Sequence, residues 1–171
     1  MSNQTIYLVD ANSFITPYKE YYQFDMAKSF WNFLEELIAK EVIVVARKVY
    51  DEVLKGTDDL SEWMKQFSLC CIDHRLPEVL ENYKKVLGHI QEQTTYYTPK
   101  ALAEWSDNSK ADAWLVAIAM ANGYTVITFE RPNRSLGTSP SGHPKIPDIC
   151  AKFGVPCINL FEMMKRLNFK F

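Results

Sequence analysis

Length, composition and charge describe an ordinary globular chain and exclude several classes of protein. The 171 residues are 47% hydrophobic and 23% charged, which fits one domain with a full-sized core. A formal net charge of -2 excludes a strong overall attraction to nucleic acid or anionic membranes, so a polyanionic partner would need a local basic patch. The polar start Met1–Thr5 is unlike a signal peptide, no apolar run could cross a bilayer, and the four cysteines show no CxxC spacing. We therefore expect a cytoplasmic protein with reduced core thiols and no membrane partner.

The first buried strand is expected at Ile6–Val9, and it ends at Asp10. A short continuous apolar run is typical of a parallel strand that is covered on both faces. An aspartate at such a strand end is costly to desolvate unless something pairs with it, and α/β proteins bind ligands outside the carboxyl ends of their strands. Asp10 is therefore the first candidate for chemistry. The alternative is that it caps the following turn, helped by Asn12 and Ser13.

Strands and helices alternate along the rest of the chain. This alternation predicts an α/β fold with a mostly parallel sheet in a single domain. Apolar residues at helical spacing, with start and stop signals, define the helices, while the apolar run at 69–72 has no assignment. Further strands are expected at 42–46, 125–129 and 156–159, and an aromatic-rich turn at 14–24. Helices are expected at 26–40, 47–54, from 57, from 77, and at 99–105, 111–121, 146–153 and 160–167. The expected helix caps are Asp25, Ser106 or Asp107, and Asn159.

Four acidic residues are expected at one edge of this sheet. Asp10 and Glu130 follow strands one and three, so both lie at the carboxyl edge. The helix of Glu52 starts at that edge, and the helix of Asp112 begins there because it leads back into the third strand. Helical phase places Glu52 beside the buried stripe and points Asp51 away from it.

Several carboxylates cannot crowd together ionised without a counter-charge, and no lysine or arginine is interleaved with these four at a fixed spacing. A hard divalent cation resolves the repulsion, whereas three scattered histidines are too few for zinc. The sequence therefore predicts Mg²⁺ or Mn²⁺ held by the four acids, with Asp148 as a weaker fifth candidate. The alternative is that each acid is an unrelated cap or surface charge.

This pattern resembles the PIN-domain family over nearly the whole chain, from Ile6 to about Asn159. The order and spacing of the motifs carry the resemblance, since each motif alone is common. The sequence departs from the family in an extended middle, in a long loop after the third strand, and at position 130, where the family usually has aspartate. The matching motifs are Asp10 within Leu8–Asn12, Glu52 followed by Val53, Asp112 opening an alanine-rich helix, and Thr128 with Glu130 two residues later.

The resemblance implies a Rossmann-like three-layer α/β/α fold with a small, mostly parallel sheet, and the extended middle is expected as a helical insertion at about 57–105. It implies metal-dependent cleavage of RNA or DNA phosphodiester bonds. We expect an endoribonuclease that cleaves single-stranded or structured RNA through an acidic two-metal site, with DNA as the alternative substrate. Asp10, Glu52 and Asp112 would hold one metal, and Glu130 would help to hold a second or orient a water. Many small members are toxins of toxin–antitoxin systems, so an antitoxin protein is an expected partner, and a homodimer is another.

Residues near the acids would bind the substrate if the resemblance holds. The loop 131–145 contains basic residues and no acid, which suits a lip that binds the phosphate backbone, although a mobile solvated loop is the alternative. Turn and strand-end hydrogen bonding is likewise the alternative role for the polar neighbours of the acids. The expected substrate-binding residues are Asn12, Ser13, Thr128, Arg131, Arg134 and Lys145, with His143 beside them. The aromatic candidates for base stacking are Trp105, Trp114 and the tyrosines at 18–22. For Trp114, packing in the core is favoured over stacking.

Other classes remain as alternatives. A Mg²⁺-dependent phosphatase of the haloacid-dehalogenase type needs a second aspartate two residues after the first, and Asn12 stands there. A phospho-accepting receiver domain needs a lysine at the end of a later strand, and the third strand leads to Glu130 instead. A catalytically weak PIN-like module that binds nucleic acid or protein stays open, although the complete set of four acids argues against it.

Overall fold

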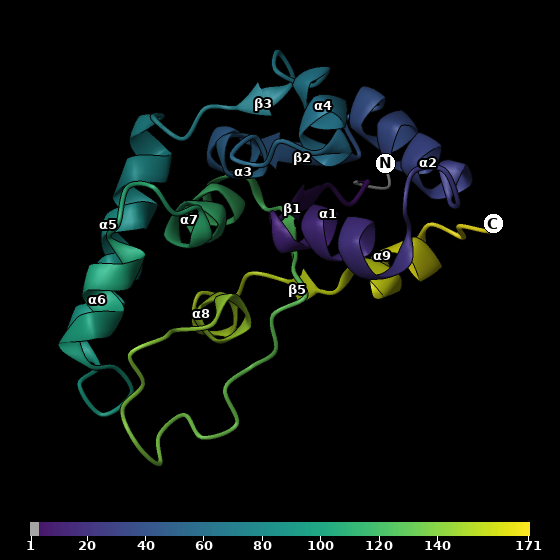
Figure 1. Cartoon of the computed structure of the whole chain (residues 1–171). Helices are drawn as coiled ribbons and strands as arrows, with labels where there is room; N and C mark the ends of the chain where they lie inside the picture. Colours follow the sequence, from purple (N-terminus) through teal and green to yellow (C-terminus); the bar gives the residue numbers. More distant parts are fainter. Residues whose placement is uncertain (1–3) are drawn as a thin grey trace.

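A five-stranded, fully parallel sheet forms the centre of the computed structural model, which describes residues 4–171 (Figure 1). The three buried strands and the edge strand expected near the C-terminus are present, and the apolar run at 69–72 contains the opposite edge strand. The strands are β1 (Tyr7–Val9), β2 (Ile43–Ala46), β3 (Cys71–Ile72), β4 (Thr125–Ile127) and β5 (Cys157–Ile158), in the order β3-β2-β1-β4-β5.

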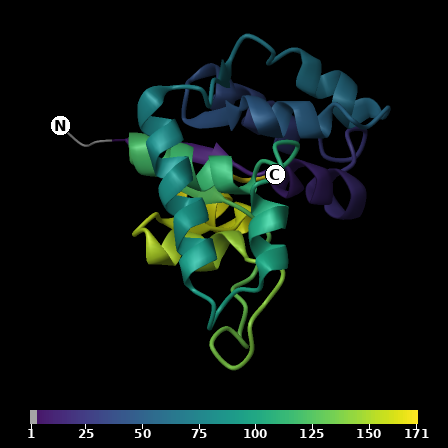
Figure 2. The ribbon, with the colours of Figure 1, turned by 90° about the vertical axis from the view of Figure 1, so that its left-hand side faces the viewer.

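Helices cover both faces of the sheet, which confirms the expected three-layer α/β/α fold. Figure 1 shows α7 and α8 on one side and α2 and α9 on the other, and Figure 2 looks onto α5 and α6, the outermost helices of the first side. The helices are α1 (Asn12–Thr16), the π-helical turn η1 (Pro17–Tyr21), α2 (Lys28–Ala39), α3 (Arg47–Val53), α4 (Asp59–Lys65), α5 (Pro77–Glu92), α6 (Pro99–Trp105), α7 (Asp112–Asn122), α8 (Ile146–Lys152) and α9 (Leu160–Arg166).

The pairing of the central strands positions the predicted site. In the parallel register, Tyr7 lies beside Ile43 on one side and beside Thr125 on the other. The carboxyl ends of β1, β2 and β4 therefore meet at the same edge of the sheet, where α1, α3 and the loop after β4 begin. Within residues 4–171, no helix is long and apolar enough to cross a membrane.

The segment 14–24, expected as an aromatic-rich turn, is mostly helical instead. α1 passes directly into η1, and the N–H of Tyr22 donates to the carbonyl of Pro17, five residues back (2.6 Å). Proline has no N–H for the ordinary helical ladder, and a local π turn accommodates this loss without ending the helix. The apolar residues Phe14 and Ile15 pack on the core, so tertiary contacts stabilise a helix that the local sequence does not favour.

Two of the predicted helix caps are wrong. α2 follows Ala27 and α7 follows Ala111, and neither helix has a side-chain cap, so Asp25 is not a capping residue. Asp107 instead accepts a hydrogen bond from the N–H of Ser109 in the preceding turn (2.8 Å). Asn159 does cap α9, because its side chain accepts from the N–H of Glu162.

The core contains both tryptophans that were candidates for base stacking. Trp105 and Trp114 are buried, which confirms core packing for Trp114 and leaves neither ring free to stack on a base. All four cysteines are free, but only Cys150 is fully buried, and Cys70 is exposed. The prediction of four core thiols is therefore wrong for Cys70, which precedes the short edge strand β3 rather than facing the centre of the sheet.

Candidate functional site

Asp10 lies at the carboxyl end of β1 with only 5% of its surface exposed. Its N–H donates to the carbonyl of Ile127 at the end of β4 (2.9 Å), which brings the two strand ends together. The hydroxyl of Thr128, also buried, donates to Oδ2 of Asp10 (2.8 Å). The carboxylate therefore turns toward β4 and does not cap α1, which has no side-chain cap.

Asp112 begins α7 near Asp10, and the two carboxylates have strongly raised pKa values. Burial raises the pKa of Asp10 to about 8, the hydrogen bond from Thr128 opposes the rise, and the charges of Asp112, Glu130 and Glu52 add to it. Burial also raises the pKa of Asp112 to about 6, with further contributions from Glu130 and Glu52. The four acids named from the sequence are thus close enough for their charges to influence one another.

Helical phase distinguishes the two neighbouring acids of α3 as expected. Glu52 is half-buried, and its charge contributes to the raised pKa values of Asp10 and Asp112. Asp51 is exposed and contributes to neither. α3 starts where β2 ends, so its second turn presents Glu52 toward the carboxyl edge of the sheet.

Glu130 is held differently from the other acids. Its Oε2 accepts a hydrogen bond from the N–H of Ile146, the first residue of α8 (2.8 Å). Its Oε1 lies 3.4 Å from Nζ of Lys145. Lys145 therefore supplies a counter-charge to Glu130. The sequence did not indicate this pair, because no lysine or arginine recurs at a fixed spacing from the four acids.

The four carboxylates fit a divalent metal ion in their chemistry but not in their spacing. Among residues 4–171, no three histidine, cysteine, aspartate or glutamate side chains lie close enough together to hold a metal ion. The contacts of Glu130 with Lys145 and Ile146 hold one of the four carboxylates at the side of the site. The chemistry of the set nevertheless fits a hard cation, because every donor is a carboxylate oxygen. In the described part of the chain, the buried Asp10 has a hydroxyl and no basic side chain as its hydrogen-bond partner. A cation shared by all four would require the carboxylates to move closer together and Glu130 to leave its contacts with Lys145 and Ile146.

The polar neighbours of Asp10 form one hydrogen-bonded network. Asn12 Oδ1 accepts from the N–H of Phe129 (3.0 Å), and its Nδ2 donates to the hydroxyl of Thr128 (3.2 Å). Ser13 is fully buried, and its hydroxyl donates to the carbonyl of Ile127 (3.3 Å). Asn12, Ser13 and Thr128 therefore fix the ends of β1 and β4 and orient Asp10, which is the strand-end role considered from the sequence.

The basic residues of the loop 131–145 differ in whether they form an ion pair. Arg131 and Arg134 are exposed and form no ion pair within residues 4–171, whereas Lys145 pairs with Glu130. A short parallel bridge holds the loop near its far end, where the N–H of Thr98 donates to the carbonyl of Ser141 (3.0 Å). In return, the N–H of Ser141 donates to the carbonyl of Tyr96 (2.8 Å).

A further carboxylate near the site, Glu104 on α6, is not among the candidates named from the sequence. Its charge contributes to the raised pKa of Asp112, and its two oxygens pair with Nδ1 of His143 (2.7 Å) and Nζ of Lys110 (3.6 Å). The partners are distant in sequence or separated by a loop, so no helical spacing indicates them. His143 therefore contacts an acid in the structure rather than standing free as part of a basic lip.

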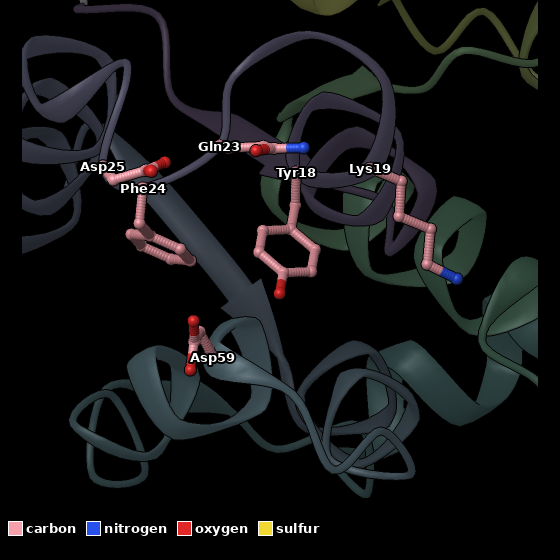
Figure 3. A pocket seen from close by; sticks show the side chains of 6 residues that line it. All are labelled: Tyr18, Lys19, Gln23, Phe24, Asp25 and Asp59. Carbon is pink, nitrogen blue, oxygen red and sulfur yellow. The ribbon is translucent and has the colours of Figure 1, made fainter.

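Two other features lie outside this network. Asp148, the weaker fifth candidate, accepts a hydrogen bond from the N–H of Asn133 through its Oδ2 (2.9 Å) and so fastens the loop. A pocket of about 540 Å³ opens between η1 and α4, where Tyr18 and Phe24 project toward Asp59 (Figure 3). None of the four acids lines this pocket.

Comparisons with known proteins give a fold relative and a family. The structure resembles the crystal structure of VapBC2 from Rickettsia felis bound to a DNA fragment from their promoter, with a TM-score of 0.52. The two chains are 15% identical, and the match covers 91% of this chain and 98% of that chain. The similarity supports the PIN-like fold expected from the sequence motifs. No curated protein matches the chain. The model of a domain of unknown function, DUF4411, matches residues 7–171, and the chain therefore belongs to the DUF4411 family.

Proposed function

We propose that this chain is a metal-dependent endoribonuclease whose site is formed by Asp10, Glu52, Asp112 and Glu130. The observation that carries the proposal is the buried Asp10 carboxylate at the carboxyl edge of the sheet, oriented by Thr128 and close enough to the half-buried Asp112, to Glu52 and to Glu130 for their charges to raise its pKa. Strongly shifted carboxylates that influence one another are typical of functional sites. The PIN-like fold and the motif resemblance support phosphodiester cleavage, with RNA as the substrate.

The residues of the site have distinct proposed roles. Mg²⁺ or Mn²⁺ bound by the four acids would stabilise charge on the phosphate and lower the pKa of a bound water. Thr128 holds one oxygen of Asp10 and so directs the carboxylate, while Asn12 and Ser13 fix the two strand ends. Arg131, Arg134 and Lys145 would bind the phosphate backbone of the substrate.

The relative also suggests a class of partner. The fold relative is VapBC2 bound to a DNA fragment from its promoter. Because the motifs resemble those of the PIN-domain family, in which many small members are toxins, we propose that this chain is a toxin whose activity an antitoxin protein restrains. A homodimer is compatible with this assignment. We further propose that the chain is one PIN-like domain in which residues 57–105, containing α4, β3, α5 and α6, are an insertion.

Cleavage of labelled single-stranded RNA by the purified chain tests the activity. We expect cleavage with Mg²⁺ or Mn²⁺, none with EDTA, and none by the Asp112→Asn variant with either metal. Asp51→Asn is the matched control, because Asp51 is an exposed acid next to Glu52 that does not affect the pKa of Asp10 or Asp112. Cleavage that persists in both EDTA and Asp112→Asn would rule out the proposed metal site.

Expression of the chain in bacteria tests the toxin assignment separately. We expect growth to stop on induction of the wild type and to continue on induction of Asp112→Asn at the same protein level. Normal growth with active wild-type enzyme would leave the nuclease assignment in place and contradict the toxin role.

A further inference from the structure

Three aromatic rings form a continuous strip that starts beside the acidic site. Phe129 stands between Thr128 and Glu130, and its ring contacts that of Phe161 in the first turn of α9 (centroids 5.4 Å apart). The ring of Phe161 in turn contacts that of Tyr21 at the end of η1 (centroids 5.9 Å apart). We call Phe129, Phe161 and Tyr21 the aromatic strip, and its three members come from three separate parts of the chain.

Two of the three rings of the aromatic strip face solvent. Tyr21 is 58% exposed and Phe161 is 42% exposed, while Phe129 is half-buried at the inner end. Single exposed apolar side chains are ordinary on protein surfaces, whereas adjoining exposed rings mark a contact surface. Both contacts are edge-to-face, with interplanar angles of 74° and 72°, and the exposed parts of Tyr21 and Phe161 leave ring surface open to a flat ligand.

The charges around the strip favour an anionic ligand at its inner end. Arg131 lines a pocket of about 410 Å³ together with Glu130, Asn159 and Glu162, directly outside β5. Both acids of this pocket have a basic partner, Glu162 in Arg166 (2.9 Å) and Glu130 in Lys145 (3.4 Å). Among residues 4–171, Arg131 has no acidic partner and is the unbalanced charge of the pocket. At the outer end, the exposed Lys19 and Glu20 precede Tyr21 and balance each other. A ligand that offers phosphates near Arg131 and flat apolar rings along the strip matches this arrangement.

We propose that the aromatic strip is a stacking surface for unpaired bases of a single-stranded nucleic acid. This inference rests on the proposed function, because the strip continues from the residues that would cleave the strand. Aromatic side chains beside a basic groove bind single strands by base stacking. A duplex keeps its base faces stacked inside the helix and cannot offer them to these rings, so the strip selects single-stranded substrate.

Fluorescence anisotropy with a labelled single-stranded RNA, and with the same RNA annealed into a blunt duplex, tests the proposal. Measurements in EDTA prevent metal-dependent cleavage. We expect Tyr21→Ala and Phe161→Ala each to weaken single-strand binding from about fivefold to more than a hundredfold, the range for losing one base–aromatic stack. Tyr21→Phe and Phe161→Tyr should bind as wild type, because they keep the ring.

Tyr124→Ala is the matched control, since Tyr124 is a half-buried aromatic residue that precedes β4, at the opposite end of this strand from Phe129. This variant should bind the single strand as wild type does. Unchanged single-strand affinity in Tyr21→Ala and Phe161→Ala would overturn the proposal, and so would an equal loss of duplex binding. If these variants keep their affinity for RNA but change the oligomeric state in gel filtration, the strip is a protein interface instead.

Cleavage assays separate this inference from the proposed function. Ring-dependent binding without any metal-dependent cleavage would remove the nuclease assignment and keep the strip as a single-strand binding surface. Metal-dependent cleavage with kcat/KM unchanged in both alanine variants would remove the strip proposal and keep the nuclease. Failure of the wild type to bind single strands would overturn the strip proposal alone if cleavage is still seen.

Discussion

Asp10 and Glu130 lie at the same edge of the sheet, but their surroundings differ. Asp10 is buried, receives a hydrogen bond from Thr128, and has its pKa raised to about 8. Glu130 is only partly buried and is held by a lysine and by the N–H that begins α8. Within residues 4–171, the outer acid Glu130 thus has a positive partner and the inner acid Asp10 has none. A carboxylate that already has a counter-charge gains less from a cation, so the demand for a metal ion is greatest at Asp10. It is next greatest at Asp112, whose pKa stays raised although the charge of Lys110 lowers it.

The largest expected effect is the loss of the inner acids. Asp10→Asn and Asp112→Asn should each lower the rate of RNA cleavage by at least roughly a hundredfold, because a metal ion contributes several kcal/mol to stabilising transition-state charge. Initial rates at saturating Mn²⁺ measure this effect, and circular dichroism checks that the fold is intact. Near-normal activity in both variants would show that the inner and outer acids do not differ in the way proposed.

A smaller effect is expected from the residue that orients Asp10. Thr128→Val removes the hydroxyl that bonds Oδ2 of Asp10 and should lower activity or metal affinity by about 10- to 100-fold, as is usual for partners of metal ligands. Thr128→Ser keeps the hydroxyl and should restore most of this loss. Titration of activity with Mn²⁺ distinguishes a loss of metal affinity from a loss of folded protein. Equal behaviour of the two variants would assign Thr128 a packing role only.

The stability of the metal-free protein should fall as pH rises from 3.8, the ordinary value for an aspartate, to about 8. In this window the folded state keeps a proton on Asp10 that the unfolded chain has released, and up to about pH 6 the same holds for Asp112. The unfolding free energy should therefore drop by up to about 1.4 kcal/mol per pH unit for each acid. Urea unfolding in EDTA across this range measures the slope, and a stability that rises with pH would contradict it.

Metal should reverse this loss. A divalent cation that binds only the folded state stabilises it by about 2.7 kcal/mol at a free concentration near one hundred times its Kd. Asp10→Asn removes one charge, so at pH 8 in EDTA it should melt as high as the wild type or higher, and it should respond less to Mn²⁺. Thermal melts of the two proteins with EDTA and with Mn²⁺ make the comparison. A mutant that melts lower in EDTA, beside a wild type indifferent to Mn²⁺, would mean that Asp10 has a structural role alone.

The smallest effects are expected in the loop 131–145. Lys145→Ala removes a partly exposed ion pair with Glu130 and should change the unfolding free energy by less than about 1 kcal/mol. Arg134→Ala should leave stability unchanged and weaken RNA binding mainly at low salt, because it removes one phosphate contact. Binding measured at two salt concentrations tests this. If Lys145→Ala lowers the rate of RNA cleavage as much as Asp10→Asn does, the outer acid Glu130 is as important for activity as the inner acid Asp10.

The sequence predicted those features of the site that follow from strand order and helical phase. Buried runs ending at Asp10 and near Glu130 placed both acids at the carboxyl edge, because parallel strands end together. The spacing of valines in α3 distinguished Glu52 from Asp51, and the half-buried Glu52 beside an exposed Asp51 agrees. Both inferences use only local periodicity and one topological rule.

The sequence could not predict contacts that depend on the docking of distant segments. Glu104 reaches the site through the packing of α6, and its partner His143 comes from a loop almost forty residues away. The helical segment after Asp10 was missed because Pro17 suggests a turn, whereas a π turn and core contacts continue the helix. The pairing of Glu130 with Lys145 likewise needs the loop between them to close.

Because of the short bridge at Ser141, a protease cut in the loop 131–145 should leave the rest of the fold in place. Hydrogen bonds with Tyr96 and Thr98 fix the loop at Ser141, and the contact between Lys145 and Glu130 closes the remaining span. Cutting the chain with a protease between Arg134 and Ser139 would therefore free only two short ends. The C-terminal fragment would stay attached through β5, which pairs with β4 of the other fragment. The nicked protein should remain folded as two non-covalently joined pieces, with Lys145 still beside Glu130.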